Sequence, residues 1–183
     1  MASKNAKLNG NRMEVLGLVS IQLPGPWWWH GEDIEDVKAK GIIFRAFPDD
    51  DEEEPQDIAY LIIADVTGDT EEMNVALIDE DSAKDYDLYL HKEIKNKLPD
   101  EGMELIEWMS SELNEVEDLK ILVTPYIVHD QGRERQNIAL RMRVRESNLI
   151  IMGCFDIDLK DQLASPIFDA IRDFHILPLD AEV

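Results

Sequence analysis

The segment from residue 119 to 157 constrains the fold most tightly, because its pattern is that of three strands joined by two short turns. Between Gln136 and Arg145 apolar residues alternate strictly with others, which is the period of a strand with one face on a core. We predict two further strands at 119–128 and 149–157, with turns at 130–133 and 146–148. Such short turns join antiparallel neighbours, so the segment predicts a meander. The central strand would present two sets of side chains: Ile138, Leu140, Met142 and Val144 on one face, and Ala139, Arg141, Arg143 and Arg145 on the other.

The remaining elements predict an α+β fold. We expect strands at 15–23, 40–47 and 58–66, and a weaker one at 73–78. We also expect a helix from about Ser82, acting as N-cap, to Lys97, and a second helix at 102–115 with Leu105, Trp108, Met109 and Leu113 on one face. Ser165 and Pro166 would open a last helix as N-cap and first helical residue. The prediction is an antiparallel sheet of about six to seven strands with helices on its faces, formed by one domain at 13–183 that follows a flexible tail at 1–12.

This element order resembles the PsbP-like α/β/α sandwich. The resemblance is carried by the C-terminal part of the chain, which runs from the Trp108 segment through the arginine strand to the Ser165 helix. The superfamily includes a photosystem accessory protein, a eukaryotic Ran-binding factor and bacterial cytosolic chaperones that hold type VI secretion effectors. The resemblance covers roughly residues 13–177 and implies a binding role. Neither the triple tryptophan at 27–29 nor the acid run at 49–54 matches a feature of that family.

The charge restricts the class of partner. Forty Asp and Glu against eighteen Lys and Arg give the chain a net charge of -22. Such a surface repels nucleic acid and anionic membranes and attracts basic proteins, so we expect a basic protein partner, no nucleic acid and no membrane. The one cysteine, Cys154, lies in an apolar run and is expected to be buried and inert. The N-terminal segment lacks the pattern of a signal peptide, and we expect a cytoplasmic protein.

The sequence carries no catalytic signature that we can identify. Its four histidines lack the spacing of metal ligands, no serine has the setting of a nucleophile, and no phosphate-binding loop is present. Asp156 and Asp158 would share a strand face, as a cation site requires, and His129 precedes Asp130 at a strand end. Simple amphipathic alternation accounts for the aspartates better. We therefore predict no enzyme, no metal and no cofactor, and keep an unfamiliar enzyme using Asp156, Asp158 and His129 as an alternative.

Two segments are candidate partner-binding sites. Three adjacent indoles beside Pro24-Gly25-Pro26 cannot all point inward, so at least one should lie at the surface; a loop plug over the open end of the sheet is the alternative. Six consecutive acids would form a solvated loop whose field reaches a basic partner. Arg141, Arg143 and Arg145 could clamp an anion, but pairing with acids on neighbouring strands is favoured. The predicted binding residues are Trp27, Trp28, Trp29, Asp49, Asp50, Asp51, Glu52, Glu53 and Glu54.

The function predicted from these features is a non-catalytic, acidic module that holds or neutralises a partner protein, such as a bacterial immunity protein against a secreted toxin. Rapid, electrostatically steered association would suit that task. A secretion-effector chaperone of the PsbP-like type is the alternative. A chaperone for transmembrane segments would need an apolar concave sheet face, and the sequence patterns give no evident second apolar face.

Overall fold

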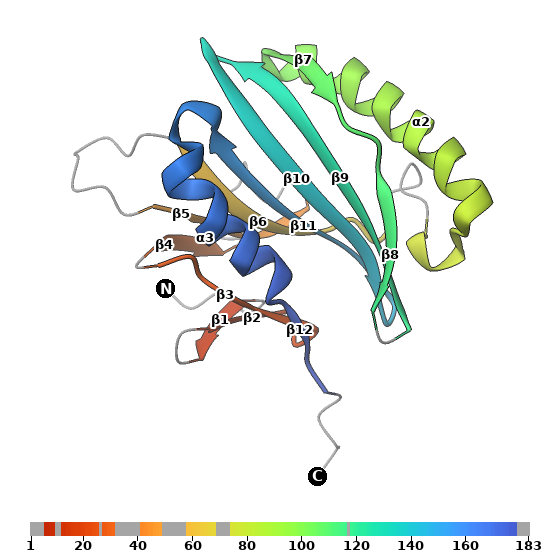
Figure 1. The fold of residues 1–183 in the computed structure, drawn as a ribbon. Helices are drawn as coiled ribbons and strands as arrows, with labels where there is room; N and C mark the ends of the chain where they lie inside the picture. Colours follow the sequence, from red (N-terminus) through yellow and green to blue (C-terminus); the bar gives the residue numbers. More distant parts are fainter. Residues whose placement is uncertain are drawn as a thin grey trace.

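The computed structural model describes residues 6–9, 12–25, 27–31, 41–48, 58–68, 74–116 and 118–178, and their strands form two antiparallel sheets (Figure 1). The smaller sheet has the order β1-β2-β3-β12, with β1 Ala6–Asn9, β2 Arg12–Val15, β3 Val19–Gln22 and β12 His175–Ile176. The larger has the order β4-β5-β6-β11-β10-β9-β7, with β8 also paired to β9. Its strands are β4 Trp28–Gly31, β5 Ile42–Phe47, β6 Ala59–Asp65, β7 Met103–Trp108, β8 Glu112–Val116, β9 Leu119–Asp130, β10 Arg133–Val144 and β11 Ser147–Asp156.

The predicted meander is confirmed and forms the middle of the large sheet. β9 and β10 are each longer than expected, and they turn at Gln131-Gly132, where both residues have positive φ. β10 ends at Val144 rather than Arg145, because Arg145 has a φ of 56° and belongs to the turn into β11. The α+β class is confirmed, although the large sheet has eight strands rather than six or seven, and a second sheet stands beside it.

The small sheet corrects the first predicted strand. The segment 15–23 is not one strand, because Leu16 and Gly17 have φ values of 57° and 65° and reverse the chain between β2 and β3. β1 lies within the segment expected as a tail and pairs with β2, where Ala6 is buried. This sheet packs on the same core as the large one.

Helix α3, Lys160–Arg172, covers one face of the large sheet (Figure 1). Ile167 and Ile171, four residues apart on the helix, are buried against that face. The predicted start was wrong: the helix begins at Lys160, and Pro166 lies inside it rather than at its first position. Gly153 of β11 makes this close packing possible, because a Cβ there would meet the side chain of Ile167 and would lie 2.6 Å from Cδ1 of Ile171.

Helix α2, Glu80–Lys97, lies beside β7 and β8, at the side of the large sheet away from β4 (Figure 1). Asp79, not Ser82, is its N-cap; Ser82 is the third residue of a capping box in which each side chain binds the other's backbone N–H. Tyr86 and Leu90 are the buried residues of this helix. Residues 74–78, the described part of the weak strand predicted at 73–78, hold the short 3₁₀ helix η1, Val75–Leu77, instead of a strand.

The predicted helix at 102–115 was wrong, since the segment forms β7 and β8 against β9. Met103, Leu105 and Trp108 face inward, with Glu104 and Glu107 exposed between them. A bulge between Leu105 and Glu107 shifts the register by one residue. The shift places Leu105 and Trp108 three apart on one face, which imitates the spacing of a helix.

Candidate binding cavity on the large sheet

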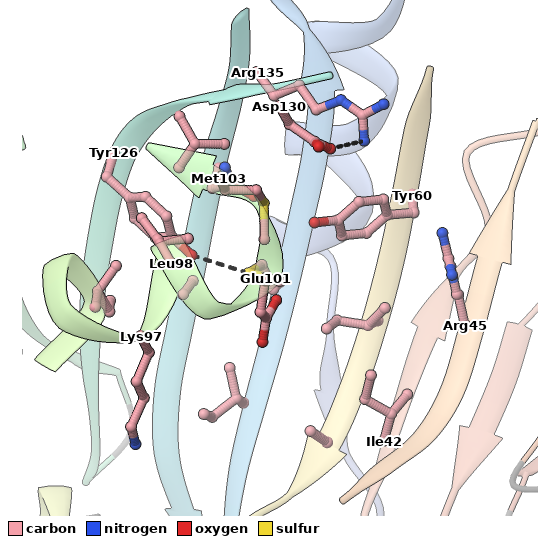
Figure 2. Close-up of a pocket in the computed structure, with 18 of the residues that line it drawn as sticks. Ile42, Arg45, Tyr60, Lys97, Leu98, Glu101, Met103, Tyr126, Asp130 and Arg135 are labelled. Carbon is pink, nitrogen blue, oxygen red and sulfur yellow. Dashed lines mark hydrogen bonds and ion pairs between the residues drawn. The ribbon is translucent and has the colours of Figure 1, made fainter. Parts of the chain in front are cut away.

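A cavity of about 420 Å³ lies over the large sheet on the face opposite α3. Its floor is formed by five adjacent strands, from β5 across β6, β11 and β10 to β9, and α2 with the residues that follow it forms one wall (Figure 2). The apolar side chains of the floor include Ile42, Ile62, Ala64, Val128, Ala139, Ile150 and Met152.

Strand alternation explains why the sheet is apolar on both faces. In β6, Leu61 and Ile63 pack toward α3, whereas Ile62 and Ala64 line the cavity. In β11, Ile151 belongs to the core under α3 and its neighbours in sequence line the cavity. Near-continuous apolar runs are the pattern of a strand covered on both sides. The second apolar face that the sequence patterns left without support is therefore present.

The wall is formed where α2 and the 3₁₀ helix η2, Leu98–Glu101, pack against β9. Ile94 and Leu98 pack with Tyr126, and Trp108 stacks on the Tyr126 ring at 5.8 Å between centroids. The Tyr126 hydroxyl donates to Sδ of Met152 at 3.5 Å (Figure 2). Burial raises the pKa of Tyr126 to about 12, although the Arg141 charge acts in the opposite direction. The Tyr126 phenol itself is therefore shielded from water, with 8% of the residue exposed.

A buried charge network closes one end of the cavity. Arg135, only 5% exposed, lies 3.1 Å from a carboxylate oxygen of Asp130 and 3.1 Å from one of Asp156 (Figure 2). Arg133 binds the other oxygen of Asp156 at 3.1 Å. Two arginines therefore hold Asp156, one of the three residues of the alternative enzyme site. Cross-strand pairing of opposite charges is thus seen for Arg133 and Arg135, whereas the sequence favoured it for Arg141, Arg143 and Arg145.

The other two residues of that alternative enzyme site lie elsewhere. Asp158 lies in the 3₁₀ helix η3, Ile157–Leu159, beyond the strand. His129 lies between Val128 and Asp130 in β9, and both of these neighbours line the cavity. Its side chain therefore points to the opposite face of the strand. The three residues thus do not converge. Within the described ranges, no group of three His, Cys, Asp or Glu side chains is placed to hold a metal ion.

Arg141, Arg143 and Arg145, which were expected on one strand face, have three different surroundings. Arg141 is 7% exposed, lines the cavity and donates to the Thr124 hydroxyl at 3.3 Å. Arg143 binds Glu146 at 3.0 Å and Asn148 at 3.1 Å near the strand end. Arg145 donates to the backbone carbonyls of Gly17 and Leu177 and so ties the two sheets together.

The tryptophan segment behaves partly as a surface feature. Trp27 and Trp29 are half-buried against the core, and the Trp29 ring lies 6.2 Å from that of Phe44. Trp28, on the edge strand β4, is 59% exposed. The expectation that at least one ring lies at the surface is confirmed, while its contact with a partner stays a prediction. The acid run at 49–54 lies outside the described residues.

Two solved structures are similar to this chain in fold, at low sequence identity. The structure of the cyanobacterial PsbP (CyanoP) from Synechocystis sp. PCC 6803 aligns with a TM-score of 0.63 and 13% identity, over 96% of this chain and 94% of that one. LpqN, described as involved in cell envelope biogenesis of Mycobacterium tuberculosis, aligns with a TM-score of 0.53 and 12% identity, over 87% of this chain and 83% of that one. The chain has a PsbP-like fold. A scan of protein-family models and a search of curated proteins give no match.

The described helices also bear on membrane insertion. None of them combines the length and the apolar character that a membrane-spanning helix needs.

Proposed function

We propose that the chain is a cytoplasmic, non-catalytic binding protein that holds an apolar helical segment of a partner protein in the cavity on the face of the large sheet opposite α3. The observation that carries the proposal is the cavity opposite α3, floored by apolar side chains from five strands. Of the two binding roles derived from the sequence, this supports the chaperone-like role over the immunity role.

The strands of the floor favour a helix as the occupant. β6, β11, β10 and β9 each have a strand on both sides, so their backbone groups already bind within the sheet. A segment placed on this face meets side chains only and must satisfy its own N–H and C=O groups, which an α-helix does. Five strands about 4.8 Å apart span about 19 Å, enough for a helix of about 10–12 Å diameter.

The proposal is tested with a synthetic helical peptide of about 15 residues, rich in Leu and Ala, with one central Gln and uncharged tails. Calorimetry should show stoichiometric binding to the full chain. Met152→Lys should weaken this binding at least about tenfold, because a cation would then be buried against the apolar peptide. Leu88→Lys is the matched control: Leu88 lies on α2, is 66% exposed and does not line the cavity.

Two results would contradict the proposal: no binding of the peptide, or equal weakening by both lysine variants. The second would place the peptide outside the cavity. Thermal unfolding of each variant shows whether the fold is retained.

The exposed tryptophan favours a second candidate function, the binding of a basic partner by the acidic outer surface. Trp28 offers a large exposed ring on an edge strand, and the net charge of -22 would draw a basic protein toward it. An immunity role would use Trp28 together with Trp27, Trp29 and the acids at 49–54, the binding residues predicted from the sequence. The two candidates differ in how salt changes the rate of association.

A further inference from the structure

The exposed indole of Trp28 lies on the same face of the large sheet as the cavity. Arg45 of β5 lines the cavity, whereas the next residue, Ala46, belongs to the core under α3. Side chains alternate along a strand, so Phe47 returns to the cavity face. In the antiparallel pair of β4 and β5, Trp28 lies opposite Phe47 and Trp29 lies opposite Ala46. Directly opposite residues share a face, so Trp28 projects on the cavity side while Trp29 packs into the core.

Trp28 is also close to the lining of the cavity. On this side the lining ends at β5, with Ile42 and Arg45, and β4 is the next strand, about 4.8 Å away (Figure 1). Arg45 lies two residues from Phe47 and is thus the diagonal cross-strand neighbour of Trp28, which puts their Cα atoms about 7–8 Å apart. Trp28 is 59% exposed. A large apolar surface therefore stands at the rim of the cavity.

A helix held on this face must extend beyond the cavity itself. The volume of about 420 Å³ is that of a small-molecule site, so a helix can insert only one stripe of side chains and rests on the surrounding residues. Laid across the strands, a helix of 15 residues is about 22 Å long, and the six strands from β9 to β4 span about 24 Å. Laid along them over β5, it overhangs β4, because its radius of about 5–6 Å exceeds the strand spacing.

We propose that Trp28 is the outer anchor of the cavity site: the partner helix that fills the cavity also places a large apolar side chain, such as Leu or Phe, on the Trp28 indole. Contact between the two removes both apolar surfaces from water, and tryptophan is prominent among the residues that dominate binding energies. The inference rests on the proposed function and extends the apolar stripe that the partner must carry. It also attributes the exposed tryptophan to the binding of a helix and not to that of a basic partner.

The test uses the Leu- and Ala-rich peptide described above, made without tryptophan. Trp28→Ala should weaken its binding about tenfold in calorimetry, as expected for a residue that dominates binding. Because the peptide is uncharged, the loss should be the same at low salt and at about 1 M salt. Leu88→Ala is the matched control: it removes a similarly exposed apolar side chain from α2, outside the lining, and should leave the affinity unchanged.

Tryptophan fluorescence gives a readout that a merely structural role of Trp28 would not produce. Covering an exposed indole moves its emission to shorter wavelength, so the peptide should shift the emission of the wild-type chain. Trp28→Phe keeps a ring in β4 and should bind the peptide with most of this shift lost. The other three tryptophans are present in both proteins. If Trp28→Ala does not fold, this comparison still decides the inference.

The outcomes separate the two proposals. Equal affinity of Trp28→Ala and the wild type, or equal weakening by Trp28→Ala and Leu88→Ala, would overturn the inference and leave the proposed function standing. The same holds if Trp28→Ala weakens the binding of a Lys-rich peptide alone, since the ring would then serve the second candidate function. Failure of the helical peptide to bind the wild type would overturn both proposals.

Other occupants of the cavity would also overturn both. Binding of dodecanoate without binding of the helical peptide would identify a lipid site. Self-association of the full chain that protects Trp28 and excludes the peptide would identify a second copy as the occupant.

Discussion

At the scale of single residues, Tyr126 links the cavity to stability at alkaline pH. Burial raises its folded-state pKa to about 12, from the ordinary value of 10.0 for tyrosine. The folded state therefore holds the phenolic proton more tightly than the unfolded state, so this stabilisation is complete below pH 10 and is lost as the pH rises toward 12. A shift of about two pKa units corresponds to about 3 kcal/mol at full effect.

Replacing Tyr126 with Phe should remove this loss. We expect the unfolding free energy of Tyr126→Phe, followed by urea titration between pH 9 and 12, to fall less steeply with pH than that of the wild type. Tyr89→Phe, on the half-buried side of α2, is the control for general alkaline effects. Parallel curves for Tyr126→Phe and the wild type would show that the phenol ionises without cost in the fold.

At the scale of elements, α3 packs closely on β11 because Gly153 has no side chain. Gly153→Ala should destabilise the protein by about 1–3 kcal/mol, because the added methyl group overlaps Ile167 and Ile171 in a filled core. Ile171→Val, which removes Cδ1, should recover part of that loss in the double variant. Chemical denaturation of the four proteins measures the coupling, and strictly additive effects would contradict the proposed overlap.

The elements also show what could be predicted from the sequence. The meander and α2 followed from local periodicity, and the α+β class followed from their order. The paired strands β7 and β8 did not, because the bulge after Leu105 imitates helical spacing. The start of α3 was missed because Pro166 is tolerated inside the helix, against its usual preference.

Of the candidate sites, too, one was predicted from the sequence and one was not. Sequence reasoning identified the exposed tryptophan segment, since three adjacent rings cannot all be buried. It missed the cavity, although β6 and β11 carried the signal in their near-continuous apolar runs. Such a run shows that both faces of a strand are apolar. Whether an element of the same chain fills the second face depends on the position of α2, which is a tertiary property.

At the scale of the whole molecule, the net charge distinguishes the two candidate functions by their response to salt. The field of a net charge of -22 extends over a Debye length of about 8–10 Å at physiological salt and acts on a charged ligand before contact. It acts little on the uncharged helical peptide, whose association rate should change little with salt. It attracts a basic partner, whose association should become slower as salt is raised.

The acid run at 49–54 is a prominent source of this field, with six charges in succession. Conversion of all six to Asn and Gln should lower the association rate constant of a Lys-rich peptide several-fold at low salt and leave that of the uncharged helical peptide of equal length nearly unchanged. Above about 1 M salt, where screening is nearly complete, variant and wild type should agree. Stopped-flow measurements across a salt series test both expectations at once. If the Lys-rich peptide associates equally fast with variant and wild type at every salt concentration, the acid run does not attract a basic partner, and the acidic surface contributes to solubility and not to the choice of partner.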